Sequence, residues 1–551
     1  MEPGWGSCCI LIVAILPTLL TRAHHAIPLR DMFSEMLSGT SKQQQPVIDD
    51  ENRHFRTDHL QSDLAGRSTR GGAVTLSAQV FKFVISTVAT IVLARMLTPE
   101  DYGLIGMVVI ITSFVGMFQY LGLSTATVKW AELSHPQVST LFWINVGLSA
   151  VIMVVTVACG PLLAWFYKEP RLIGITAGYA VSILFTGLYI QHEAILIRQM
   201  RFAAVAIVEI GAIALGLGAA IVAAWYGAGY WALVVNMLVM TLATAVGLWV
   251  TCGWRPGLPV RGSGVRKMLS YGGDLTGFNF MSYFARNMDN LLIGRVWGAH
   301  QLGVYSRAYQ MLLTPVQQIN SPVVAVAIPA LSRLANSPDR YRAAYLKILE
   351  KVAMITMPGV AFMIAMSNWL VLFLLGSQWQ ESGRIFMLLG IAAIIQPVAR
   401  TALWLFTTQG RSREIFKWGV MSAAIAVVSI VAGLPWGAVG VAASYAITDL
   451  SISTPLLFWY VGRRGPVRQG DLYRTIAPAA GASVCSLIVL FVSRPWLERF
   501  PHLGIRLIIA LAMTIAVSLL VFAALPAGRL AMRSSKEMLK LLVKRERESV
   551  V

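Results

Sequence analysis

The sequence predicts an all-α polytopic membrane protein with about fourteen transmembrane helices, arranged as two six-helix lobes plus two C-terminal helices. Of the 551 residues, 56% are hydrophobic and only 13% are charged. The mean hydropathy is +0.65, and apolar stretches of bilayer-spanning length recur along the chain. About a quarter of the residues in a soluble domain are charged, so the composition excludes an ordinary soluble enzyme. Its high hydrophobicity equally excludes a disordered chain.

The predicted spans begin at Gly72 and follow one another with short connections. Each is close to the roughly 20 residues that an α-helix needs to cross a bilayer. The spans cover residues 72–97, 102–127, 138–165, 172–191, 203–225, 230–251, 269–294, 301–329, 348–375, 385–409, 418–433, 438–461, 475–492 and 507–525. The span 418–433 is short, and its helix is expected to begin near Glu414.

Composition divides the chain into six parts. They are an N-terminal cytoplasmic, mostly disordered extension (1–71), a first six-helix lobe (72–251), a basic cytoplasmic linker (252–268), a second six-helix lobe (269–461), two additional transmembrane helices (475–525) and a basic cytoplasmic tail (526–551). The extension holds one apolar run, Cys8–Leu20, which is too short to span comfortably. A start of the chain at Met32 or Met36 is an alternative that N-terminal sequencing would test.

Lysine and arginine predict the orientation. The connections after even-numbered spans carry 18 of these residues, and those after odd-numbered spans carry 7. Cytoplasmic loops are enriched in Lys and Arg, so both termini are expected in the cytoplasm. This bias also accounts for most of the net charge of +19 without a nucleic-acid partner.

Two sequence echoes indicate an internal repeat. LARMLTPEDYGLIG at the end of the first span matches LIGRVWGAHQLGVYS at the end of the seventh, at an offset of 200 residues. In each, an arginine precedes a glycine by eight residues: Arg95 and Gly103, then Arg295 and Gly303. YGAGYWALVV and WGAVGVAASY form a second echo at an offset near 210. Two parallel six-span halves imply a cleft between them.

The stretches VLARMLTPEDYGLIGM and DNLLIGRVWGAHQLGVYSRAYQ and the turn GAVGVA resemble the polysaccharide-exporter branch of the multidrug/oligosaccharidyl-lipid/polysaccharide (MOP) superfamily. The similarity is to Wzx-type flippases of the colanic-acid-exporter kind, over about residues 68–526. It implies a fourteen-helix MATE-like fold and alternating access in the bacterial cytoplasmic membrane. The implied cargo is an undecaprenyl-pyrophosphate-linked oligosaccharide for exopolysaccharide or lipopolysaccharide biosynthesis. The further partners are membrane lipid, a polysaccharide polymerase and glycosyltransferases, and no cofactor is implied.

Basic residues inside the spans are the candidates for substrate binding, because a pyrophosphate needs a cationic path and a charge at membrane depth is costly. Lys82 lies in the first span, Arg286 in the seventh and Arg400 in the tenth. Lys82 can instead snorkel to the interface. Arg286 can instead form a helix-packing pair with Asp289, three residues away.

Four acidic residues inside or near the spans are candidates for proton or sodium coupling. They are Asp289, Asp274, Glu209 and Asp449. Each is alternatively a packing group with satisfied hydrogen bonds. Arg95, Gly103, Arg295 and Gly303 form the structural repeat motif. The two arginines are expected either to cap carbonyls of the preceding helix or to make gating contacts between the halves.

Several function classes are disfavoured. The sequence has no GxxxxGK[ST] loop, no CxxC motif and no zinc spacing among its five cysteines, so neither catalytic residues nor a metal site are expected. A membrane polymerase or ligase usually carries a long outer loop, and the predicted outer connections are short. A drug/cation antiporter of the same superfamily is the nearer alternative, but basic residues at depth favour an anionic cargo.

Overall fold

The computed structural model describes residues 64–116, 133–260 and 266–526 and a few positions outside these ranges. Those positions are Phe55, Gln119, Ser124, Thr127, Val128, Trp130, Gly528–Leu530 and Met532. Between residues 266 and 286 the description covers the backbone and, of the side chains, only that of Tyr283. The predictions for most of the N-terminal extension, for the linker residues 261–265 and for the tail from residue 533 lie outside the described residues.

Every regular element in the described residues is a helix. The α-helices are α3 (Leu64–Met96), α4 (Pro99–Gly116), α6 (His135–Tyr167), α7 (Leu172–Arg198), α8 (Phe202–Trp225), α9 (Trp231–Cys252), α10 (Arg266–Arg333), α11 (Pro338–Ala365), α12 (Ser367–Leu374), α13 (Gln380–Ala393), α14 (Gln396–Thr408), α15 (Ser412–Gly433), α16 (Gly437–Thr448), α17 (Thr454–Gly462), α18 (Gln469–Leu497) and α19 (Leu503–Ala524). Short 3₁₀ turns cover Ser377–Trp379 (η4) and Leu434–Trp436 (η5), and Asp449–Ser453 (η6) is a π-helix.

Twelve stretches of the described residues are long and apolar enough to cross a membrane, and two of these stretches are helical hairpins. In the first, Gly298 of α10 has φ 80° and ψ −175°, and the Tyr305 hydroxyl donates to Asp289 Oδ2 at 2.9 Å. These residues would lie about 24 Å apart along one straight helix, so α10 reverses direction at Gly298. In the second, Ser444 Oγ donates to the Ser429 carbonyl at 2.8 Å across the turn that joins α15 and α16. With the two arms of each hairpin counted separately, these twelve stretches make fourteen segments, and the predicted all-helical fold class is confirmed.

Three of the predicted spans are broken in ways that the hydropathy did not indicate. The span 348–375 consists of the end of α11 and of α12, which are separated at Met366. The span 385–409 consists of α13 and α14, which meet just before Pro397. Proline lacks a backbone N–H and clashes with the preceding turn, so a helix restarts with it in its first turn. The span 438–461 contains the π-helix η6 between α16 and α17. Single π turns inside helices frequently mark functional sites.

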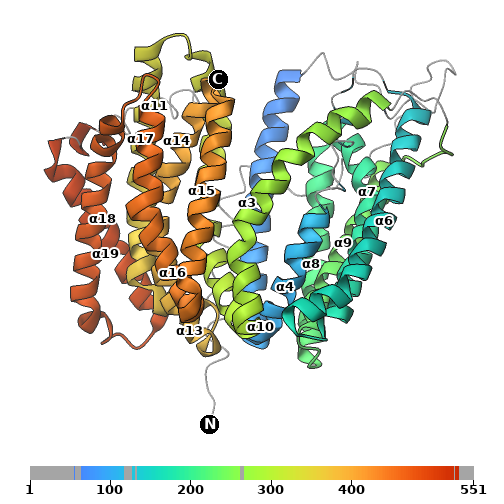
Figure 1. Ribbon diagram of the computed structural model, residues 1–551, viewed down its shortest axis with the longest axis horizontal. Coiled ribbons are helices and arrows are strands. Elements are labelled where there is room, and N and C mark those ends of the chain that lie inside the picture. Colours follow the sequence, from blue (N-terminus) through green and yellow to red (C-terminus); the bar gives the residue numbers. More distant parts are fainter. Residues whose placement is uncertain are drawn as a thin grey trace. The chain divides into compact units, whose positions relative to one another are not determined.

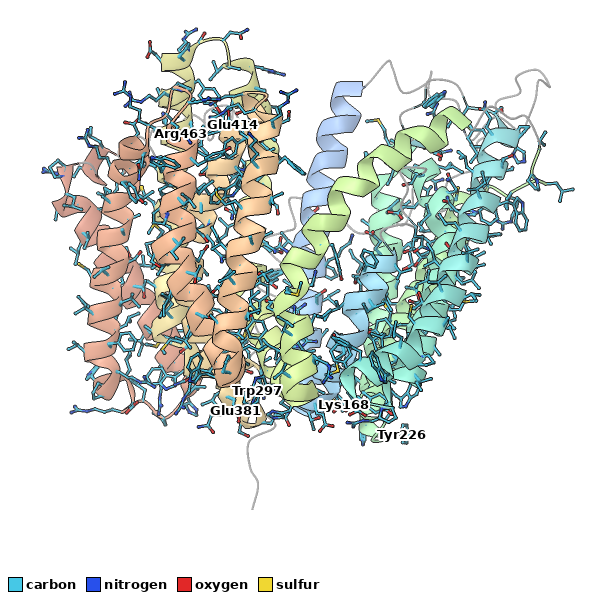
Figure 2. The ribbon with its side chains drawn as sticks, in the orientation of Figure 1. Lys168, Tyr226, Trp297, Glu381, Glu414 and Arg463 are labelled. Atoms are coloured by element: carbon cyan, nitrogen blue, oxygen red, sulfur yellow. The ribbon has the colours of Figure 1, made fainter. Side chains whose placement is uncertain are left out.

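The turns between helices lie at two opposite ends of the bundle (Figure 2). Lys168, Tyr226, Trp297 and Glu381 lie at one end, and Glu414 and Arg463 lie at the other. We call these the Gly298 end and the Arg411 end. Several large aromatic side chains near the Gly298 end are strongly exposed, namely Trp165, Trp225, Tyr226 and Trp436. Tryptophan and tyrosine concentrate at membrane–water interfaces, so this girdle is consistent with a bilayer surface near the Gly298 end.

Helix contacts fall into two groups that α10 joins (Figure 1). α6 packs on α7, α8 on α9, α7 on α9 and α3 on α8. In the second group α11 packs on α18, α18 on α19, α15 on α16 and α13 on α16. The two arms of α10 pack on α4 and also on α13, α15 and α16. One continuous hydrophobic cluster runs from the end of α3 through α4 and α10 to α16. The contacts between these two groups of helices therefore include the surroundings of Gly298.

Candidate functional site

The repeat glycines form a close helix crossing between α4 and the second arm of α10. A Cβ atom on Gly103 would overlap the carbonyl oxygen of Ala299, and a Cβ atom on Gly303 would overlap the carbonyl oxygen of Pro99. Positions 99 and 103 correspond to 299 and 303 at the offset of the repeat. The crossing, which we call the seam, therefore has a two-fold pattern, and only glycine lets the two backbones approach so closely.

The two repeat arginines each contact a helix of the other half. Arg95 Nη2 donates to the Phe373 carbonyl at 2.6 Å, at the end of α12. The Arg295 guanidinium lies 5.6 Å from the centre of the Phe166 ring, at the end of α6. Phe166 and Phe373 end the third span of their respective halves. The structure thus brings both arginines to equivalent places at the Gly298 end.

Further hydrogen bonds join the α3–α4 turn to η4. The Trp379 indole donates to the Ala94 carbonyl at 2.8 Å, and Gln378 Nε2 donates to the Leu97 carbonyl at 2.9 Å. Tyr102, at the start of α4, is buried and packs edge-on against Trp379, with ring centroids 5.4 Å apart. Side chains from the second half thus satisfy carbonyl groups at the C-terminus of α3 that the helix itself leaves unpaired.

Arg307 lies one turn beyond Gly303, and its guanidinium lies 3.7 Å from the centre of the Tyr102 ring. Its Nη1 donates to Gln310 Oε1 at 2.8 Å, and Tyr179 of α7 lies within electrostatic reach. Within the part of the chain that the structure describes, no carboxylate forms an ion pair with Arg307. A half-buried arginine with an uncompensated charge can bind an anion through its planar fork of donors.

Lys82 is paired in the structure. Its Nζ forms an ion pair with Glu209 Oε2, which joins α3 to α8. Glu193 of α7 interacts electrostatically with both side chains. The first half therefore holds one cation and two carboxylates in one cluster, and the charge of Lys82 is already compensated.

Asp289 belongs to a polar network in the second half. Its carboxylate accepts hydrogen bonds from the Tyr305 hydroxyl at 2.9 Å and from the Asn290 backbone N–H at 2.8 Å. The rings of Tyr305 and Tyr309 stack with centroids 6.2 Å apart, and Tyr445 lies within electrostatic reach of Asp289. Buried polar networks of this kind fix the relative positions of the helices that carry them.

The network continues to the π-helix. Gln396 Nε2 donates to the Tyr445 hydroxyl at 3.1 Å, and Asp449 lies close to the Gln396 side chain. Asp449 Oδ2 is buried, and among the described residues it has no hydrogen-bond partner. Arg400, one turn along α14 from Gln396, is exposed and lies within electrostatic reach of Asp449. Two predicted residues, Asp449 and Arg400, are thus brought together by the break at Pro397.

For two predicted site residues the structure describes the backbone only. Arg286 and Asp274 lie on the first arm of α10, but their side chains are outside the described part of the chain. The predicted pair between Arg286 and Asp289 is therefore untested, and the described partners of Asp289 are Tyr305 and Asn290.

Sequence reasoning missed two charged residues. The predicted fourth span ended at residue 191, whereas α7 continues to Arg198 and carries Glu193. Arg307 lies inside the predicted span 301–329, and a charge at that depth was a signal that could have been used.

Comparisons with known proteins agree on a family and a fold. The family model described as "Polysaccharide biosynthesis protein" matches residues 92–384, more than half of the chain. The lipopolysaccharide biosynthesis protein WzxC of Escherichia coli (strain K12) is 23% identical over 403 residues, covering 72% of this chain and 81% of that protein. The succinoglycan biosynthesis transport protein ExoT of Rhizobium meliloti (strain 1021) is 22% identical over 452 residues, covering 81% and 90%.

Among solved structures, the lipid II flippase MurJ in an inward closed conformation superposes with a TM-score of 0.63 at 13% identity. The match covers 81% of this chain and 98% of that one. These similarities confirm the predicted resemblance to Wzx-type exporters of the MOP superfamily, and they indicate a multi-pass membrane transport protein rather than an enzyme.

Proposed function

The chain belongs to the polysaccharide biosynthesis protein family, and on that premise we propose that it is a flippase for an undecaprenyl-pyrophosphate-linked oligosaccharide repeat unit. The proposed transport crosses the bacterial cytoplasmic membrane by alternating access and serves exopolysaccharide or lipopolysaccharide biosynthesis. A polysaccharide polymerase and glycosyltransferases are the proposed partners, because they consume and supply such a repeat unit.

Arg307 is the observation that carries this proposal. A pyrophosphate head group is anionic, so its path needs a cation that no carboxylate already neutralises. Arg307 fits this requirement beside the seam, with the rings of Tyr102 and Tyr179 close to it. A cationic drug would be repelled by the same guanidinium, which disfavours the antiporter alternative.

The other predicted basic residues are secondary proposals. Lys82 is engaged by Glu209 and can reach a phosphate only when that pair opens. Arg400 lies near Asp449, so its charge is partly offset. Arg286 remains a proposed phosphate ligand because of its position in α10.

Two parallel halves, residues 72–251 and 269–461, are the proposed moving bodies, with residues 475–525 as an appended pair of helices. The two-fold pattern of the seam supports this division. Basic residues such as Arg411, Arg463 and Arg464 lie at the Arg411 end. The positive-inside rule therefore supports a cytoplasmic Arg411 end, cytoplasmic termini and an outward-facing Gly298 end.

Coupling to a proton or sodium ion is proposed for the acidic residues. Asp289 and Asp449 are connected through the tyrosine and glutamine network, and Asp449 Oδ2 has no hydrogen-bond partner within the described part of the chain. Glu209 has the same proposed role in the first half, where Glu193 adds a second carboxylate. Asp274 is kept as a candidate by its position alone.

The test is an export assay in a cell that makes the polysaccharide and lacks its own copy of this chain. Arg307→Ala is expected to abolish surface polysaccharide and to leave the lipid-linked precursor on the cytoplasmic side. Arg307→Lys is expected to restore part of the activity, because it keeps the charge and loses the fork. Arg474→Ala, an exposed change on α18, is the matched control for loss of an arginine. Normal export by Arg307→Ala at normal membrane abundance would overturn the proposal.

A further inference from the structure

We propose that the seam is the outlet gate of the transporter and that Arg307 couples this gate to cargo. When Arg307 binds a phosphate group, its guanidinium leaves the Tyr102 ring, and the seam is released. The inference rests on the proposed function, because it takes the Gly298 end as the exit and a phosphate-bearing molecule as the cargo.

Backbone contact makes the seam a closed gate. At Gly103 and Gly303 there is no room for a Cβ atom, because the backbone of the other helix occupies that space. The backbones of α4 and α10 therefore touch without any side chain between them. No cargo can pass between two helices in this arrangement, so export at this end requires them to separate. Because the contact needs glycine on both helices, even one added methyl group must push the helices apart.

Hydrogen bonds hold the seam shut from its rim. Arg95 donates to the Phe373 carbonyl, Trp379 to the Ala94 carbonyl and Gln378 to the Leu97 carbonyl. The Arg95 bond is exposed and the Gln378 bond is partly buried, so water can replace both as the gate opens, whereas the buried Trp379 bond meets water only once the helices have parted. The rim can therefore break without leaving buried unpaired groups, which is a requirement for a contact that opens in every cycle.

Tyr102 links the rim to the cation. The Trp379 ring packs against the Tyr102 ring, with centroids 5.4 Å apart. The Arg307 guanidinium lies 3.7 Å from the centre of the same Tyr102 ring. A guanidinium that forms charge-assisted bonds to phosphate gives up a weaker contact with an aromatic ring. Phosphate binding thus removes one of the contacts that keep Tyr102 in the closed position.

A disulfide across the seam tests the gate. A Cβ atom at Gly106 would lie 3.6 Å from Leu302 Cγ, so Gly106→Cys with Leu302→Cys places two thiols within bonding reach. Both are introduced into a chain whose own cysteines are replaced by serine, and each single cysteine serves as a control. Oxidation with diamide is expected to stop export, and reduction is expected to restore it. If the fully oxidised protein exports at the same rate as the reduced protein, the proposal that the seam is a gate is wrong.

Adding a methyl group tests the glycine contact. Gly103→Ala in the two-cysteine protein is expected to lower the rate of disulfide formation by about tenfold, a change of about 1.4 kcal/mol in the closed population. Gly116→Ala is the matched control on the same helix, because nothing lies within 4 Å of its Cβ position. An unchanged rate in Gly103→Ala, in protein that runs as a single species on size exclusion, would contradict the inference.

Inorganic pyrophosphate tests the coupling in purified protein. It is expected to slow disulfide formation in the two-cysteine protein and to leave the rate unchanged when Arg307→Ala is added. Diamide is the oxidant because pyrophosphate chelates copper catalysts. If pyrophosphate changes neither protein, or both equally, the coupling through Arg307 is wrong. This measurement uses no lipid-linked sugar, so its result does not depend on the natural cargo. Discovery of a different natural cargo would contradict the proposed function and would not affect the result for the gate.

Discussion

Replacing Lys82 with methionine separates a packing role from a cargo-binding role. Methionine keeps a long flexible side chain and removes the cation. In the structure Lys82 joins α3 to α8 through Glu209, and Glu193 lies within electrostatic reach. The Lys82→Met protein therefore keeps two neighbouring carboxylates that have lost their cation, and we expect it to be less stable.

The exposed fractions of the pair set the magnitude. Removing one partner of a buried ion pair costs about 3–5 kcal/mol, whereas a fully exposed pair contributes about 0–1 kcal/mol. The side chains of Lys82 and Glu209 are 19% and 34% exposed, which lies between these limits. We therefore expect Lys82→Met to lose about 1–3 kcal/mol. Adding Glu209→Gln removes the carboxylate that paired with Lys82 and its repulsion with Glu193, and should recover most of this loss.

The assay compares thermal unfolding of the purified proteins in one detergent with polysaccharide export in cells. We expect Lys82→Met to unfold at lower temperature and the double variant with Glu209→Gln to regain stability. Export is the second readout, and it returns in the double variant if both residues serve packing alone. That outcome follows if the ion pair serves packing while Arg307 binds the phosphate. A double variant that is as stable as the original protein and still fails to export would refute a packing role alone and would give Lys82 or Glu209 a direct part in transport, as a cargo ligand or as an ion-coupling residue.

Three further predictions concern the second half and the topology. Tyr305→Phe removes the hydroxyl that donates to Asp289, so the protein should lose about 1.5–3 kcal/mol of stability, measured by the same unfolding assay. Arg286→Ala should abolish export and Arg286→Lys should restore part of it; recovery of abundance and export on adding Asp289→Ala would show instead that the pair is structural. Reporter fusions at Ser337 and Gly465 should both read cytoplasmic, and an outside signal at either breaks the proposed orientation.

Hydropathy and charge patterns predicted the helices well because each span must be apolar over a fixed length. They did not predict the breaks at Pro397 and at the π-helix from Asp449, since an apolar run looks the same whether its helix is continuous or interrupted. The end of α7 was also placed too early, because Gln191, His192 and Glu193 resemble a polar connection in sequence. In the structure Gln191 and His192 are buried.

The site was only partly predictable, because charge compensation depends on which helices are neighbours. Lys82 and Glu209 are 127 residues apart, and nothing in the sequence pairs them. The same limit applies to Arg307, whose isolation from carboxylates in the described residues follows from the packing of α10 on α4 and not from local pattern. Depth in a span identifies charges that need a partner. The fold decides which of them obtain one.

The repeat contained more information than its residues suggest individually. Similar offsets of the two echoes predicted two related halves, and the glycines of both repeat motifs meet in one crossing with two-fold correspondence. The sequence predicted that each repeat arginine either caps carbonyls of its own preceding helix or makes gating contacts between the halves. The carbonyls of Ala94 and Leu97 instead receive hydrogen bonds from Trp379 and Gln378, across the sequence midpoint. A helix end that is capped by the opposite half loses its caps when the halves separate, so the stability of the α3 terminus and the closure of the seam change together.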